Sequence, residues 1–284
     1  MRQSSRKFLI FAIAVIIIVP SVYVIVSELK APAAPKPASA YVPAGSSISG
    51  HISFNNTSIY YFVYGGSPGL VVDLNTFGKF TELNVSSNLS SSGGNISGHH
   101  YYMSVDFGGV LIFNTTVNLT QLTASDLFMS YLGQLNMSSL NMSNLSITKF
   151  NLFFAVPSPS VVVAGLQSSV ESAILASLNK QGVTHSTLDL DRGANFSLIA
   201  SVASGSEIYN VSLFAYSSNS TLQLNPVTNN SSYAFQSVFN EISTQFNSEI
   251  VFKDSIAGMN LPIGVSEASF LSLLKYVFQM IVVI

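Results

Sequence analysis

Residues 58–74 read SIYYFVYGGSPGLVVDL, and this stretch decides the fold class. Two runs of β-branched, aromatic and aliphatic residues, 58–64 and 70–74, flank the segment Gly65-Gly66-Ser67-Pro68-Gly69. Apolar runs of this kind, separated by a short cluster of Gly and Pro, are typical of a β-hairpin. The stretch therefore predicts two antiparallel strands with a turn between them.

The same pattern recurs along the chain, with helices between pairs of strands. Further strands are expected at 101–106, 110–119, 149–156, 160–164, 196–203 and 209–216, with a second turn at Gly108-Gly109. Helices are expected where apolar residues recur at helical spacing, at 124–135, 166–179 and 232–252. This order predicts an α+β fold, a mainly antiparallel sheet with helices packed on one face. The blocks do not align with one another, so no duplication is inferred.

The last segment, 266–284, admits three interpretations. Polar residues recur in it at helical spacing, at Ser269, Ser272, Lys275 and Gln279. A helix with this narrow polar stripe would lie in the core or at a subunit interface. The β-branched end, 280–284, also fits a strand. The apolar character also fits a membrane-associated segment, although it is short for crossing a bilayer.

Charge is scarce in this chain. Charged residues make up 8% of it, and 48% of its residues are hydrophobic, whereas an ordinary soluble domain has about 25% charged residues. Paired carboxylates lose their stabilising contribution as pH falls through their folded-state pKa, so a domain with few of them has little to lose in acid. The composition thus suggests a host that lives in an acidic medium. The net charge of −2 without a basic patch argues against nucleic acid as a partner.

Residues 8–26, FLIFAIAVIIIVPSVYVIV, are predicted to cross the membrane as an uncleaved signal-anchor. Arg2, Arg6 and Lys7 precede this run, so the positive-inside rule places the tip 1–7 in the cytoplasm and the rest of the chain outside. A cleaved signal peptide is one alternative, with its nearest good site at Ala38-Ser39-Ala40. A pilin-type leader is another.

A Pro/Ala-rich spacer is expected after the anchor. Residues 31–47 read APAAPKPASAYVPAGSS, with four prolines, and such segments adopt extended polyproline II. We therefore divide the remainder into a stalk, 27–47, and an extracellular α+β domain, 48–284, with a possible subdivision near 145–190.

Asparagines in the glycan-acceptor pattern Asn-x-Ser/Thr are unusually frequent. The chain has 22 Asn, and Ser plus Thr make up 61 of its 284 residues, so random placement would give about five such sites. The fifteen candidates are Asn55, Asn56, Asn84, Asn88, Asn95, Asn114, Asn118, Asn136, Asn141, Asn144, Asn195, Asn210, Asn219, Asn229 and Asn230. Together with the apolar span they predict a glycosylated outer-surface protein. A Ser/Asn-rich composition without any glycan is the alternative.

The gaps between acceptor sites are informative too. No acceptor follows Asn230, and none lies between Asn144 and Asn195. Because a glycan excludes tight contact, a sugar-free zone is either interior or an interface. We therefore expect the C-terminal helices to form a buried face, a self-associating face or a contact with a protein partner.

No motif predicts a catalytic, cofactor or metal site. The segment 65–69 matches Gly-x-Ser-x-Gly, but a strand rather than a helix is expected after it. His99-His100 are adjacent, and neighbouring residues of a strand point to opposite sides. The segment 189–193 resembles the start of a calcium loop but lacks its later ligands. The remaining histidines, His51 and His185, are expected on the surface.

Tyr60-Tyr61 and Tyr101-Tyr102 are expected to place one ring on each face of a strand. Outward rings could stack on sugars or on a partner, while inward rings would fill the core. There is no Cys, so a disulfide or a thiolate metal site is excluded.

In composition the chain resembles surface proteins of thermoacidophilic archaea, which have short anchors, Ser/Asn-rich ectodomains and many acceptor sites. The resemblance rests on no family-defining motif. It implies a non-enzymatic, membrane-anchored extracellular glycoprotein with an envelope or surface-interaction role. An anchored binding module or accessory subunit of a membrane complex is the alternative, and a hydrolase on the secreted side is a second.

Overall fold

A computed structural model of the chain describes a defined set of residues. They are 36–54, 57–73, 94–96, 99–118, 149–158, 161–182, 194–204, 207–225, 232–253, 255–265 and 267–282. Predictions that fall elsewhere, among them the span 8–26 and the helix 124–135, lie outside the described residues.

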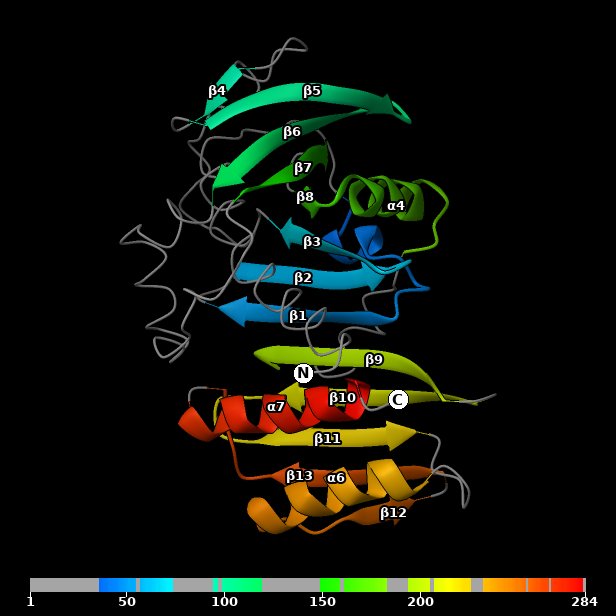
Figure 1. Cartoon of the computed structure of the whole chain (residues 1–284), viewed down its shortest axis with the longest axis vertical. Coiled ribbons are helices and arrows are strands. Elements are labelled where there is room, and N and C mark those ends of the chain that lie inside the picture. Colours follow the sequence, from blue (N-terminus) through cyan, green and yellow to red (C-terminus); the bar gives the residue numbers. More distant parts are fainter. Residues whose placement is uncertain are drawn as a thin grey trace.

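The described strands form one antiparallel sheet (Figure 1). They are β1 Ile48–Phe54, β2 Thr57–Tyr64, β3 Ser67–Asp73, β4 Gly94–Ile96, β5 His99–Phe107, β6 Val110–Asn118, β7 Lys149–Ser158, β8 Val161–Gly165, β9 Phe196–Ser204, β10 Glu207–Ala215, β11 Ser220–Asn225, β12 Val251–Lys253 and β13 Ile256–Leu261. Their order across the sheet is β12-β13-β11-β10-β9-β1-β2-β3-β8-β7-β6-β5-β4. The meander β1-β2-β3 occupies the centre, so the predicted hairpins are confirmed.

Two Gly-Gly turns close the predicted hairpins. Gly65 and Gly66 have φ of 56° and 78°, and Tyr64 pairs directly with Ser67. Gly108 and Gly109 have φ of 61° and 80°. Positive φ at both central residues is the geometry that matches the twist of antiparallel strands, and Gly adopts it without a Cβ clash. The first turn is tighter than the five-residue segment 65–69, so β3 begins three residues earlier than expected.

Helices pack on both faces of the sheet, so the prediction of a single covered face is wrong. The helices are η1 Ala38–Tyr41, α4 Gln167–Leu178, α6 Ser232–Gln245 and α7 Ala268–Val282. Strand β8 is buried along its whole length. Its Val161 and Val163 belong to the cluster that contains α4, whereas Val162 and Ala164 belong to the cluster that contains α7. A strand that is apolar on both sides requires cover on both sides.

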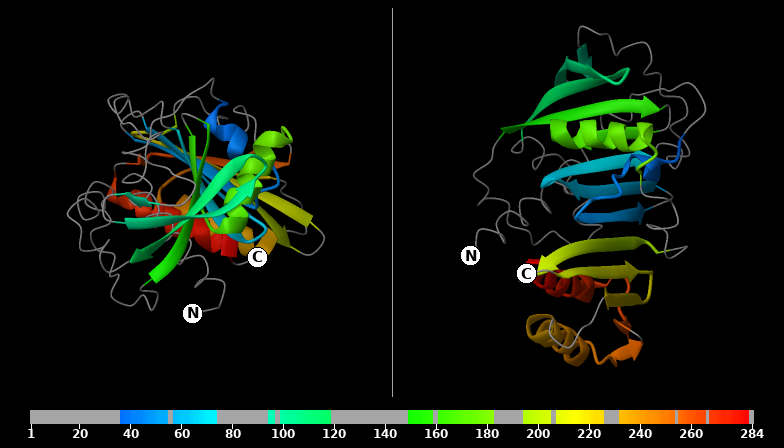
Figure 2. Two further views of the ribbon diagram at one scale, coloured as in Figure 1. Left: turned by 90° about the horizontal axis from the view of Figure 1, so that it is seen from above. Right: turned by 90° about the vertical axis from the view of Figure 1, so that its right-hand side faces the viewer.

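The two faces are covered at different parts of the sheet (Figures 1 and 2). Helix α4 packs against β7, β8 and β3, and α7 packs against α6 and β10. Each helix thus covers only a few strands of a long sheet, as the side view shows (Figure 2).

The C-terminal segment is helix α7, so the strand interpretation of 280–284 is wrong for the part described. Phe270, Leu273, Val277 and Met280 are buried in the core. The polar residues of the opposite stripe, Ser272, Lys275 and Gln279, are exposed. The expectation of a core helix with a polar stripe is therefore confirmed. Within the described part of the chain, no helix is both long and apolar enough to span a membrane.

The predicted stalk, 27–47, is wrong over its second half. Ala38, Tyr41 and Val42 are at most 3% exposed and pack against the face that carries α4. The Lys36 ammonium donates to the carbonyl oxygen of Ser177 at 2.9 Å, and the Ala44 N–H donates to the carbonyl oxygen of Gln181 at 3.0 Å. The Pro-rich composition obscured the apolar side chains between the prolines, and these join the core.

Candidate interaction surface

The edge strand β12 carries exposed apolar side chains. It is the last strand at one end of the described sheet and pairs only with β13 among the described strands. Val251 is 59% exposed and Phe252 is 62% exposed, and Ile256, at the start of β13, is 36% exposed. An edge strand presents backbone N–H and C=O groups that another strand can pair with, and natural proteins usually protect such edges with charge. Here the charge comes from Lys253 alone within the strand.

This edge lies in the part of the chain that has no glycan acceptor. Helix α6 ends at Gln245, where Asn247 adopts a left-handed φ of 48° and the Ser248 N–H donates to the Ser243 carbonyl oxygen. Left-handed Asn is a common helix C-cap. The cap ends the predicted helix 232–252 early and releases residues 251–253 to form β12. Sequence reasoning missed this strand because its three residues continue an apolar helical pattern.

A buried histidine lies at the sheet's centre, where β1 pairs with β9. His51 is 7% exposed, so the expectation of a surface histidine is wrong for this residue. Its ring nitrogens lie 2.6 Å from the Ser197 Oγ and 3.0 Å from the Ala194 carbonyl oxygen. The Tyr61 hydroxyl donates to the Ser197 carbonyl oxygen at 2.6 Å. We call His51, Tyr61 and Ser197 the seam cluster.

The seam cluster has the bonding pattern of a structural site. A carbonyl oxygen can only accept, so His51 Nε2 carries the proton that it donates to Ala194, and in the neutral imidazole Nδ1 accepts from the Ser197 hydroxyl. That hydroxyl also accepts from the His51 N–H at 3.1 Å. Ser197 is fully buried, and a nucleophile must reach substrate. The cluster therefore joins the three strands β1, β2 and β9, and its Ser197 hydroxyl is out of reach of a substrate.

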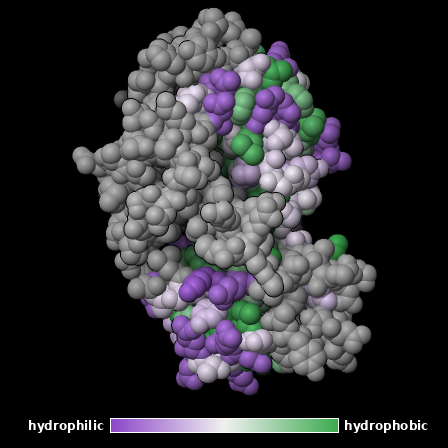
Figure 3. Space-filling view, in the orientation of Figure 1, coloured by the Kyte–Doolittle hydropathy of each residue, from purple (hydrophilic) through white to green (hydrophobic). Residues whose placement is uncertain are grey.

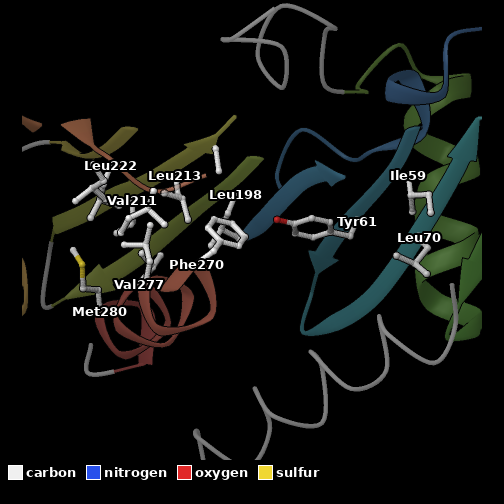
Figure 4. Close-up of a cluster of buried hydrophobic side chains, with 14 of the residues drawn as sticks. Ile59, Tyr61, Leu70, Leu198, Val211, Leu213, Leu222, Phe270, Val277 and Met280 are labelled. Atoms are coloured by element: carbon white, nitrogen blue, oxygen red, sulfur yellow. The ribbon is translucent and has the colours of Figure 1, made fainter. Parts of the chain in front are cut away.

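The paired tyrosines 60 and 61 are both buried, so the interpretation of an outward binding ring is wrong here. Tyr60 lies in the cluster on the α4 face and Tyr61 in the cluster on the α7 face. Tyr61 lies between Leu198 and Phe270 on one side and Ile59 and Leu70 on the other (Figure 4). Burial raises the pKa of both phenols, with a further contribution from Asp73 for Tyr60. The structure does not describe the side chains of Tyr101 and Tyr102.

The other sequence candidates carry no visible chemistry. Ser67, in the Gly-x-Ser-x-Gly match, lies at a hairpin turn and its hydroxyl accepts from Ser168. His99 begins β5, and its side chain and that of His100 are not described. The segment 189–193 and His185 are also outside the described residues. Among the residues that are described, no three His, Asp or Glu side chains come together as a metal site.

The structure describes six of the fifteen acceptor asparagines. Asn219 is exposed in the turn between β10 and β11. Asn195 and Asn210 are half-buried, and their side-chain oxygens accept from Ser217 and Ser201. Asn114 is half-buried on β6. Asn95 and Asn118 lie on β4 and β6, with side chains that are not described. The sites outside the described residues are Asn55, Asn56, Asn84, Asn88, Asn136, Asn141, Asn144, Asn229 and Asn230.

Comparison with known proteins identifies no family. No protein-family model matches the chain, and no curated protein matches it. Crystal form I of TP0453 aligns with 86% of this chain and 98% of its own at 12% identity, with a TM-score of 0.40. Crystal form III of TP0453 aligns with 86% and 99% at 11% identity, with a TM-score of 0.35. At these TM-scores the similarity carries no argument about fold or function.

Proposed function

We propose that the chain is a non-enzymatic, membrane-anchored extracellular glycoprotein that contacts neighbouring proteins of the cell envelope. One observation carries the proposal. The exposed apolar edge strand β12 lies in the part of the chain after Asn230, which has no glycan acceptor. Sugar would keep neighbours away from the parts of the surface that carry acceptors, whereas this edge is open to a strand of another protein.

The packing of η1 supports an anchor that stays attached. The best cleavage site for a signal peptide, Ala38-Ser39-Ala40, lies within η1, where Ala38 and Ser39 are at most 2% exposed. Cleavage there would separate Ala38 from a cluster that it helps to fill. An uncleaved anchor over residues 8–26 keeps this packing intact.

The contact is tested by photo-crosslinking in cells with an intact envelope. A benzoylphenylalanine at Phe252 of the full chain is expected to crosslink to a neighbouring protein, which mass spectrometry then identifies as a second copy or another component. The matched control is the same probe at Ile208, which is also 62% exposed. Ile208 lies near the start of β10, where it pairs with Ala203 of β9, and it is not on an edge strand. No crosslinks at 252, or equal crosslinks at both positions, contradicts the proposal.

Glycan mapping of the same preparation tests the location. Asn219, in an exposed turn, is expected to carry glycan at higher occupancy than Asn195, which is half-buried with its side-chain oxygen engaged. An acceptor site must be accessible to the transferase, and an exposed turn is more accessible than a half-buried position. Native protein without glycan at any acceptor would refute the glycoprotein assignment.

A further inference from the structure

The chain enters the folded domain beside helix α4. Lys36 is the first described residue, and its ammonium donates to the carbonyl oxygen of Ser177 at 2.9 Å and to its hydroxyl at 3.1 Å. Ser177 lies in the last turn of α4. A cation at this position also interacts favourably with the negative end of the helix dipole. The entry point is therefore held at the C-terminal end of α4.

The connection between this point and the predicted anchor is short. Residues 27–35 lie between the end of the predicted span, 8–26, and Lys36. Even fully extended, these nine residues reach only about 30 Å. Because η1 packs on the domain, the stalk cannot lengthen this reach without breaking the core. The C-terminal end of α4 is thus confined to within about 30 Å of the outer membrane surface.

The outer side of α4 is apolar where the chain enters. Leu175 is 43% exposed and Leu178 is 49% exposed, although both lie on a helix whose other side fills the core. Lys180, with Lys36, places positive charge at the same end, while Glu171 lies a turn away from Leu175 and accepts from Gln167. We call Leu175, Leu178, Lys36 and Lys180 the α4 patch. The region around α4 shows apolar and hydrophilic residues side by side (Figure 3).

The geometry points to a lipid surface as the occupant of the α4 patch. Leucine side chains flanked by lysines match the interface of a bilayer, where apolar groups enter the acyl boundary and ammonium groups meet phosphates. Two leucines alone bind a membrane weakly. A short tether makes the contact intramolecular, and the high effective concentration compensates for weak affinity. The domain therefore rests on the outer leaflet through α4, and β12 lies outside this contact. This inference rests on the proposed anchor.

The position of β12 agrees with this orientation. Seven strand steps separate β12 from β3, which α4 contacts. At about 4.8 Å per step, the free edge lies roughly 34 Å from the α4 patch along the sheet. Since α4 packs on a face of the sheet over β3, β8 and β7, the membrane contact lies on that face, and the free edge at β12 lies beyond it and is available to neighbours.

Fluorescence quenching in vesicles tests the orientation. The full chain is reconstituted in vesicles of phosphatidylcholine and phosphatidylglycerol. Because it contains no Cys, L178C and F252C each carry a single environment-sensitive probe. We expect a blue-shifted probe at 178 that lipids spin-labelled near the headgroup quench at least twofold more strongly than the probe at 252. Both native side chains are exposed, so both variants should fold, and circular dichroism checks that they do.

The outcomes separate the two proposals. Loss of vesicle flotation overturns the anchor and, with it, the orientation. Flotation with equal, weak quenching at 178 and 252 overturns the orientation alone. Energy transfer between labelled copies at 178 without lipid quenching assigns the α4 patch to a second copy, which also overturns the membrane contact. As a further check, a K180C probe should lose its quenching when Leu175 and Leu178 are both changed to Ser.

Discussion

At the scale of single residues, the seam between β1 and β9 depends on close approach. Gly50 pairs with Tyr61, and a Cβ at Gly50 would lie 2.1 Å from the Ser197 carbonyl oxygen and 2.4 Å from the Tyr61 hydroxyl. The absent side chain therefore leaves the room that the Tyr61 hydrogen bond needs. Glycine in a strand often marks such a close approach, but the sequence does not say to what.

Ser197→Ala is expected to destabilise the fold by about 1–3 kcal/mol, because it removes a buried hydroxyl that is hydrogen-bonded to the His51 ring and to its N–H. Chemical denaturation of the full chain in detergent measures this loss. Ser201→Ala is the control, since Ser201 is exposed and bonds only at the surface. Equal effects of the two substitutions would contradict a structural role for the seam cluster.

Tyr61→Phe is expected to change how stability depends on alkaline pH. Burial raises the pKa of Tyr61 well above its ordinary value of 10.0. The unfolded chain therefore loses this proton near pH 10 while the folded chain keeps it, so stability falls as pH rises above about 10. The variant lacks this proton and should show a shallower fall between pH 9 and 11.5. Thermal unfolding at stepped pH measures the difference, and parallel curves for both proteins would contradict it.

At the scale of elements, turns and strand pairing were the most predictable features. Gly108 and Gly109 lie where the sequence placed them, because the turn needs positive φ at both positions. Strand β12 and the end of α6 were not predictable, since a single left-handed Asn247 redirects the chain. The order of strands and helices does not show which face each helix covers, although the apolar runs of β3 and β8 indicate burial on both faces.

Gly109→Ala is expected to cost about 1–2 kcal/mol, the penalty for a Cβ in the left-handed region. The site is open, so the effect should come from backbone strain alone. Gly258→Ala serves as the control, because its Cβ would meet only ordinary contacts at 3.9 Å. Denaturation midpoints report both, and a Gly109 variant as stable as the parent would show that the turn is not under this constraint.

At the scale of the whole molecule, uncharged side chains form cross-strand hydrogen bonds at surface positions that ion pairs often occupy in other proteins. Three cross-strand pairs join hydroxyls to amides on the exposed surface, Thr116 to Asn151, Ser201 to Asn210 and Thr221 to Asn260. None of these groups titrates between pH 2 and 7. The composition predicts a surface rich in uncharged polar side chains. It does not predict which of them bond to each other, because that depends on the register of the strands.

Acid should therefore have little effect on the fold. We expect the melting temperature of the full chain to change by less than about 5 °C between pH 7 and pH 3, because few carboxylates lose a stabilising charge. A thermal scan at stepped pH measures it. A collapse between pH 5 and 3 would contradict the expectation of an acid-tolerant surface protein.

The packing of η1 has a mechanical consequence for an anchored protein. Tension on the membrane tether would reach the domain first at Lys36, and then at Pro43, which bridges to Gly182. Ala38, Tyr41 and Val42 are buried in the core, so η1 should detach only when the force breaks this packing. The next element is β1, which is held on both sides by β2 and β9. The molecule would yield by a short, reversible extension while its sheet stays intact.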